Sequence, residues 1–237
     1  MIDLHCHMLP GIDDGPKTME QALEMARFAV DHGTRRCVLT PHIKPGCYDN
    51  DIENIRRVFE AFQNRLAGEN IPLQVGMAAE VRVCAELPGL INQGRIPFLG
   101  RWQGMRLILL EFPHDQIPVG ADKLIDWLIG RDILPLIAHP ERNQGVMRHP
   151  EKIKPFVSRG CLLQITADSV TGLFGEVSQQ LALSFIRKDM AMLIATDAHN
   201  LYKRRPTLKA AHDMLLPIIG GDKTRALFSG NAETMLS

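Results

Sequence analysis

Several features that would define a class of protein are missing from this sequence. Its 237 residues contain no apolar run long enough to cross a membrane. A signal peptide is not expected, because Asp3 and two histidines interrupt the start and no apolar segment follows. Net charge is also absent: 27 basic residues balance 27 acidic ones, so no overall field would attract nucleic acid or an anionic membrane. We therefore expect a cytoplasmic protein with no nucleic-acid partner and no membrane insertion.

Cysteine chemistry is largely excluded as well. The five cysteines are scattered and form no C-x-x-C pair, which argues against a disulfide framework and against a zinc knuckle. None is followed six positions later by arginine, so the C-x5-R loop of cysteine-dependent phosphatases is missing. We expect Cys37 and Cys161, which fall within predicted strands, to act as small apolar residues.

Short apolar stretches alternate with helical patterns along almost the whole chain. Strands are predicted at Met1–His5, Arg36–Thr40, Leu73–Ala79, Arg106–Leu110, Leu134–Ala138, Cys161–Thr166 and Met190–Ala195. Helices are predicted at about 17–31, 51–67, 121–131, 151–159 and 176–187, with two more in the tail, and the Gly/Pro-rich stretch before Arg106 holds at most a short helix. Strands that are apolar at nearly every position indicate a parallel sheet buried on both faces. We predict one α/β domain over residues 1–237, a distorted β/α barrel of about seven parallel strands, with a doubly wound open sheet as the alternative.

The first predicted strand carries the pattern D-L-H-C-H. In an extended strand His5 and His7 point to the same face while Cys6 points to the other. Two imidazoles side by side suit a metal ion, although a chance pair of surface histidines is the simpler reading of this stretch alone. Asp13 and Asp14 follow in the next loop.

Most of the other predicted strands also lead into ligand-type residues. These residues are His42, Glu80, Glu111, His139, Asp197 and His199, and only the strand that ends at Thr166 lacks an obvious ligand. In α/β barrels the carboxyl ends of the strands form the active site. Without metal, so many carboxylates and imidazoles on one face would be poorly satisfied. An Asp/Glu/His set without thiolate suits Mn, Fe, Zn or Mg, and bridging carboxylates would hold more than one ion.

Basic residues follow two of these candidate ligands. The stretch H-P-E-R places Arg142 just after His139, and N-L-Y-K-R-R-P places Lys203, Arg204 and Arg205 after His199. Guanidinium groups bind phosphoryl oxygens bidentately, so we predict a phosphate-binding role for Arg142. The second cluster could also include residues of a solvated basic turn. His114, which follows the fourth strand, is not expected to take a direct part.

The order of these motifs resembles a known superfamily. D-L-H-C-H with D-D-G-P, then P-H, A-E, E-F, A-H-P-E-R and T-D-A-H-N, follow the motif order of the PHP (polymerase and histidinol phosphatase) superfamily. More narrowly, the opening block and the A-H-x-E-R motif resemble the bacterial metal-dependent protein-tyrosine phosphatases of the capsule-biosynthesis (CpsB, YwqE) type. The resemblance covers essentially the whole chain and implies a distorted barrel with three divalent ions, usually manganese. The implied ligands are His5, His7, Asp14, His42, Glu80, Glu111, His139, Asp197 and His199.

The same resemblance implies a reaction and a partner. Glu80 would bridge two ions, and Arg142 and Arg204 would bind the substrate phosphate, with Arg205 as the alternative to Arg204. The reaction would be hydrolysis of protein phosphotyrosine by metal-activated hydroxide, without a covalent intermediate. The expected substrate is an autophosphorylating bacterial tyrosine kinase that controls capsular or exopolysaccharide synthesis. Short loops without a lid favour such a protein substrate.

Two other functions stay open at this point. One is a PHP phosphatase of a small metabolite such as histidinol phosphate, which would share the metal site. The other is a non-catalytic metal-binding regulatory module.

Overall fold

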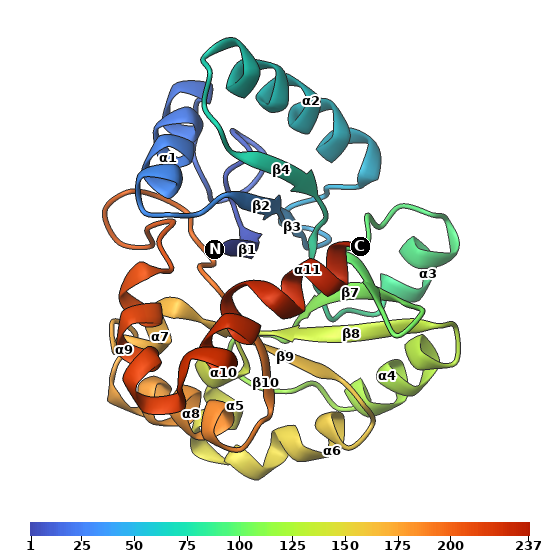
Figure 1. Cartoon of the computed structure of the whole chain (residues 1–237). Coiled ribbons are helices and arrows are strands. Elements are labelled where there is room, and N and C mark those ends of the chain that lie inside the picture. The colour runs from blue at the N-terminus through green and yellow to red at the C-terminus, as the bar shows by residue number, and fades with distance from the viewer.

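The structure is a computed structural model that describes all residues, 1–237, and its strands form two sheets. The smaller sheet has the order β1 (Ile2–Cys6), β2 (Arg36–Leu39) and β4 (Gln74–Met77), and its strands are parallel. The larger sheet contains six parallel strands in the order β10 (Ala191–Ala195), β9 (Leu162–Thr166), β8 (Ile133–Ala138), β7 (Met105–Glu111), β5 (Glu80–Arg82) and β3 (His42–Ile43). Figure 1 shows both sheets with helices outside them.

The two sheets are parts of one distorted barrel. Only two residues separate β2 from β3 and β4 from β5, so each pair is one bent strand. Backbone hydrogen bonds continue through the bends, as in Glu80 N–H to the Pro41 carbonyl at 3.1 Å. On the other side, the Asp197 N–H donates to the His5 carbonyl at 2.8 Å, which joins β1 to the end of β10. The strands therefore follow one another around a barrel, and the predicted fold class is confirmed over the open-sheet alternative.

The stretch between β5 and β7 differs from the prediction. It contains a short helix, α3 (Leu87–Asn92), and a strand that was not predicted, β6 (Gly100–Trp102), which pairs antiparallel with β7. The two strands are joined by Gln103 and Gly104, which have φ values of +50° and +85°. Two successive residues with positive φ make the tight hairpin turn that Asn-Gly usually signals. Gln-Gly is a weaker signal for the same turn, which explains the missed strand.

Helices cover the outside of the barrel, and the longer ones lie where the sequence predicted them. The longer helices are α1 (Met19–Asp31), α2 (Ile52–Gly68), α4 (Ala121–Ile129), α8 (Glu176–Arg187) and α9 (Lys209–Ile219). The shorter ones are α5 (Gln144–Arg148), α6 (Lys154–Val157), α7 (Ala167–Val170), α10 (Gly221–Arg225) and α11 (Asn231–Leu236). Of these, α5 and α7 were not predicted. The predicted helix over 151–159 is instead a 3-10 turn, Pro150–Ile153, followed by α6, because Pro155 cannot donate a backbone hydrogen bond there. No helix has the combination of length and hydropathy needed to cross a bilayer.

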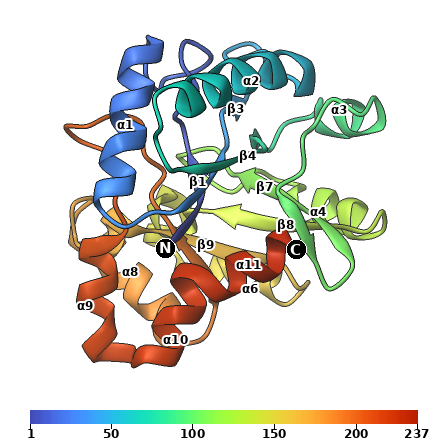
Figure 2. The same ribbon diagram turned by 45° about the horizontal axis from the view of Figure 1, so that its top comes forward.

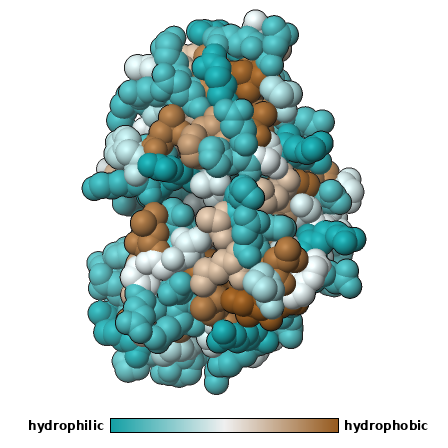
Figure 3. Space-filling model, turned by 60° about the vertical axis from the view of Figure 1, so that its left-hand side comes forward, coloured by the Kyte–Doolittle hydropathy of each residue, from teal (hydrophilic) through white to brown (hydrophobic).

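The surface and the termini complete this arrangement. On the side that carries α1 and α9, the surface is mostly hydrophilic, and the hydrophobic side chains that reach it form small separate patches (Figure 3). The C-terminal helix α11 lies next to the N-terminus in both ribbon views (Figures 1 and 2).

Alternation along the strands places the site at one end of the barrel. A cluster of 49 buried apolar residues packs mainly between strands and helices, and a separate cluster of 13 includes the apolar filling of the barrel. Leu109 on β7 and Ala195 on β10 belong to the inner cluster, and two residues further along stand Glu111 and Asp197. Met235 of α11 belongs to the same inner cluster. The apolar interior thus gives way to a layer of carboxylates and imidazoles at the carboxyl ends of the strands.

Candidate metal centre

Four buried side chains converge on the axis of the barrel: His5, His7, Glu80 and Asp197. The Nε2 atoms of His5 and His7 lie 3.2 Å apart. Each of these nitrogens is 3.3–3.4 Å from Glu80 Oε2 and from Asp197 Oδ1. Two imidazoles and two carboxylates aimed at one point form a ligand set for a divalent ion.

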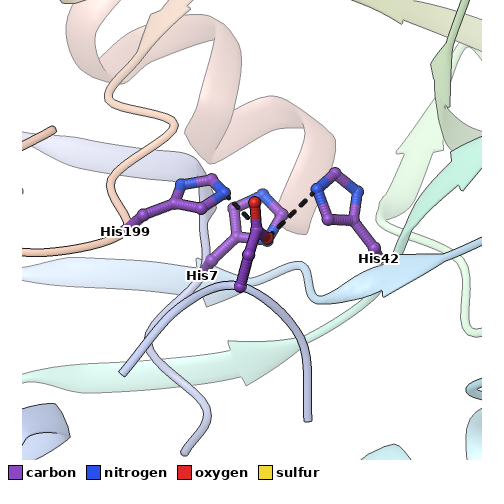
Figure 4. Close-up of side chains that lie close together, drawn as sticks. His7, His42 and His199 are labelled. Carbon is purple, nitrogen blue, oxygen red and sulfur yellow. Dashed lines mark ion pairs between the residues drawn. The ribbon is translucent and has the colours of Figure 1, made fainter. Parts of the chain in front are cut away.

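A second group lies beside the first and shares His7 with it. Oδ1 of Asp14 is 3.2 Å from Nε2 of His199 and 3.5 Å from Nε2 of His42. Figure 4 shows the rings of His42 and His199 on either side of this carboxylate, with His7 next to them. The D-D-G-P loop and the T-D-A-H turn, far apart in the sequence, therefore meet here.

A third group forms around the other side of Glu80. His42 Nδ1 is 2.9 Å from Glu80 Oε2 and 4.0 Å from Glu111 Oε2, and His139 Nε2 is 2.7 Å from Glu80 Oε1. All nine residues expected as ligands thus lie in one continuous cluster. Glu80 belongs to the first and the third group, as a bridging carboxylate would.

The donor atoms of this cluster fit divalent cations. Glu80 Oε2, Asp197 Oδ1 and His199 Nε2 are buried and lie close to other ligand atoms, but none of them forms a well-aligned hydrogen bond. Leaving buried carboxylate oxygens unsatisfied is costly, and a cation among them would remove that cost. Carboxylate oxygen and imidazole nitrogen without sulfur suit Mn, Fe, Zn or Mg.

Electrostatics hold Asp197 and His139 in the forms that bind metals. Burial alone would raise the pKa of Asp197, but Arg204, His5 and Arg142 hold it well below its usual value. For His139 it is burial that lowers the pKa, to about 4, so its imidazole is neutral at pH 7. Glu111 differs, because burial and the charge of Glu80 raise its pKa to about 7.

The D-D-G-P loop contributes more than one ligand. Oδ2 of Asp13 lies 2.7 Å from Nδ1 of His7, which leaves Nε2 of that ring to face an ion. The Gly15 N–H donates to Asp13 Oδ1 at 2.9 Å. A Cβ at Gly15 would lie 2.3 Å from the His7 carbonyl oxygen, so only glycine fits there. The family resemblance named Asp14 as the ligand and gave Asp13 no role, and the structure places Asp14 in a ligand group and Asp13 behind His7.

Two supporting residues were missed by the sequence analysis. Gln164, fully buried on β9, places Oε1 2.8 Å from Nδ1 of His5. Its signal was a single polar residue inside the apolar strand C-L-L-Q-I-T. Arg82 places Nε 2.9 Å from Glu111 Oε2, and the sequence gave no sign of this pair.

Two of the ligand residues have strained backbones. His139 has φ +33° and Asp197 has φ +52°, both in the left-handed region that non-glycine residues rarely adopt. Next to His139, the buried Glu141 accepts hydrogen bonds from the Thr166 N–H at 2.9 Å and from the Ser169 hydroxyl at 2.7 Å. These bonds attach the H-P-E-R turn to β9 and α7.

The arginines lie at the edge of the ligand cluster. Arg142 and Arg204 both form ion pairs with Oδ2 of Asp197, whereas the side chain of Arg205 is exposed. Both paired arginines line a cavity of about 210 Å³ that also contains ligand side chains from all three groups. His114 is not part of any ligand group and lies instead in a neighbouring cavity beside Arg142.

A cluster of candidate divalent-metal ligands with two arginines, at the carboxyl end of a β/α barrel, defines a metal-dependent hydrolase site suited to phosphate esters. Residues 1–237 match the family model described as capsular polysaccharide synthesis, CpsB/CapC, and the chain belongs to this family.

Two curated relatives align with the whole length of this chain. The chain is 34% identical over 236 residues to the tyrosine-protein phosphatase YwqE of Bacillus subtilis, covering all of this chain and 91% of that protein. It is 27% identical to the tyrosine-protein phosphatase CpsB of Streptococcus pneumoniae, with 98% of that protein covered. A solved structure described as YwqE and CpsB, metal-dependent tyrosine phosphatases, superposes with a TM-score of 0.92 at 33% identity, covering all of this chain and 94% of that one. An amidohydrolase from Mycoplasma synoviae shares only the fold, with a TM-score of 0.62 at 13% identity over 99% of this chain and 87% of that one.

Proposed function

We propose that this chain is a metal-dependent tyrosine-protein phosphatase, a phosphoric monoester hydrolase that acts on phosphotyrosine in proteins. The observation that carries this proposal is the junction of the ligand cluster with Arg142 and Arg204 at Asp197. Full-length relatives that bear this activity in their names support the choice of phosphotyrosine.

We assign three ions to each chain, one for each ligand group. His5, His7, Glu80 and Asp197 would hold one ion. Asp14, His42 and His199 would hold a second, and Glu111 and His139 would share Glu80 to hold a third. Manganese is the preferred ion, and the same donors would accept Fe, Zn or Mg.

The chemistry follows from this assignment. When bound, the ions supply an acidified water as nucleophile and neutralise charge on the phosphoryl group. Arg142 and Arg204 donate to the phosphoryl oxygens and position the phosphorus over the metal cluster. Asp197 holds both guanidinium groups at the site before substrate arrives. The tyrosine leaves as a phenolate of pKa about 10, so no strong general acid is required.

The physiological substrate that we propose is an autophosphorylating bacterial tyrosine kinase in the cytoplasm that controls capsular or exopolysaccharide synthesis. The family description, capsular polysaccharide synthesis, supports this context. A tyrosine on a flexible segment of such a kinase needs an open site.

Substrate comparison tests the proposed activity. We expect phosphotyrosine peptides to be hydrolysed well, phosphoserine peptides much less and histidinol phosphate poorly, as measured by kcat/KM. If histidinol phosphate is preferred by more than tenfold, the metabolite phosphatase replaces the proposed function. If the metal-loaded protein hydrolyses none of the three, it is a non-catalytic metal-binding module.

A further inference from the structure

Two more cavities adjoin the metal site, one beyond each arginine. The first, of about 560 Å³, is lined by Arg142, and the second, of about 540 Å³, is lined by Arg204. Phe174 lines both cavities. Its side chain therefore stands between the two spaces through which a substrate could approach the arginines.

The rims of these cavities carry exposed apolar side chains. Val177 in the first cavity is 50% exposed, and Leu173 and Tyr202 in the second are 62% and 75% exposed. They are three of the six large hydrophobic residues that the chain exposes. Apolar groups gathered beside a charged site indicate a surface that contacts an apolar part of the ligand.

Phe174 is in direct contact with the residue that we assign to the phosphate. The guanidinium carbon of Arg142 lies 4.3 Å from the centre of the Phe174 ring. The same guanidinium reaches Asp197 at the metal cluster. In a phosphotyrosine the ring is joined to phosphorus through one oxygen. A phosphoryl group bound by Arg142 would therefore bring its aromatic ring close to Phe174.

The backbone holds Phe174 in place. Gly172 and Gly175 flank the pair Leu173–Phe174 with φ values of +87° and +92°, and the Gly175 N–H donates to the Gly172 carbonyl at 3.0 Å. The Gln179 side chain packs against Gly172 and donates to the Val170 carbonyl at 2.9 Å. The ring is thus presented by a tight turn between α7 and α8.

We propose that Phe174 is the specificity-determining residue that contacts the tyrosyl ring of the substrate, beside the phosphate-binding Arg142. This role rests on the proposed function. The side chain of phosphoserine has no ring and is too short to fill the same space. Phe174 would therefore favour aryl over alkyl phosphate esters at a metal site that serves both.

A second aromatic side chain could contact the tyrosyl ring instead of Phe174. Tyr48 lines the metal cavity from the β3–α2 loop, and its ring is parallel to that of His42 at a centroid distance of 5.6 Å. It lacks the apolar rim found around Phe174, and its ring faces a metal ligand. We therefore use it as the competing variant in the test.

The test compares two peptides of identical sequence, one with phosphotyrosine and one with phosphoserine, on the metal-loaded enzyme. In Phe174→Ala we expect kcat/KM for the phosphotyrosine peptide to fall about tenfold, and kcat/KM for the phosphoserine peptide to change less than about twofold. Inhibition by inorganic phosphate should stay unchanged, because Arg142 is intact. Phe174→Tyr should retain the preference, and Ile218→Ala, an exposed apolar residue of α9, should have no effect. Phe174→Leu, which keeps more of the packing, serves the same comparison if the alanine variant does not fold.

Three results would overturn this role. An equal loss for both peptides with weaker phosphate inhibition would mean that Phe174 only positions Arg142. If Phe174→Ala keeps the preference for phosphotyrosine over phosphoserine, Phe174 has no role in specificity. The same holds if only Tyr48→Ala loses this preference. Failure of the unaltered enzyme to hydrolyse phosphotyrosine is a separate result, which would overturn the proposed function and this role with it.

Discussion

The carboxylate of Asp13 lies 2.7 Å from Nδ1 of His7 and so turns the opposite nitrogen of that ring toward the metal cluster. A carboxylate behind a ligating histidine fixes its tautomer and raises its basicity. We expect Asp13→Ala to weaken metal binding by about 10- to 100-fold, as measured by metal titration of the stripped protein. Asp31→Ala, at an exposed position on α1, is the control. Unchanged affinity in the Asp13 variant would mean that this contact does not matter for binding.

Metal content is the second prediction. The three ligand groups lead us to expect three divalent ions per chain, and loss of hydrolysis after chelation, with recovery on adding Mn²⁺. His5→Ala and Glu80→Ala should abolish turnover and lower the ion count, as measured by elemental analysis. Full activity in protein shown to be free of metal would contradict the assignment.

The arginines give the third prediction. Arg142→Ala and Arg204→Ala should each lower kcat/KM by about 10- to 1000-fold, because they remove charge stabilisation of the phosphoryl group, while metal content stays the same. Arg205→Ala is the matched control, since its side chain is exposed. Should Arg205→Ala be impaired and Arg204→Ala be silent, the phosphate role belongs to Arg205.

Glu111 gives a prediction about pH. Its pKa in the folded metal-free protein is raised to about 7 from 4.5. As pH rises through this interval, the unfolded chain releases a proton that the folded protein keeps, so the free energy of unfolding falls. Glu111→Gln should reduce this fall by about 2 kcal/mol between pH 5 and pH 7.5, as measured by urea unfolding of chelated protein. The exposed Glu60→Gln is the control, and an identical pH slope in the Glu111 variant would count against the effect.

Two cysteines test the expectation that thiol chemistry plays no part. Cys37 and Cys161 are 0% and 4% exposed and lie in the outer apolar cluster. Replacing either with alanine removes a small buried group, so we expect a loss of about 1 kcal/mol in unfolding free energy. The value of kcat/KM, measured at a temperature where the variants remain folded, should change less than twofold. A large loss of activity with unchanged stability would contradict a purely structural role.

The candidate ligands could be identified from the sequence because their residue types and their places after apolar strands are local features. His5, Glu80, Glu111 and Asp197 stand at or just beyond the ends of apolar strands, and parallel strands bring their carboxyl ends to one face. The barrel itself followed from the repeated strand–helix pattern. Strand β6 was missed because its turn uses Gln103 and Gly104, whose positive φ angles the residue types only weakly signal.

Only the tertiary structure decided which of these residues contact one another. The family resemblance had chosen Asp14 as the ligand and Arg204 over Arg205, but the contact of Asp13 with His7 and that of Arg204 with Asp197 depend on loop geometry and are seen only in the fold. Gln164 supports His5 from 159 positions away, and Phe174 contacts Arg142 across a different loop. The sequence thus determined which chemical groups are present and at which end of the barrel they gather. Their pairing needed the folded chain, because contacts between distant segments follow from packing and leave no periodic trace in the residues.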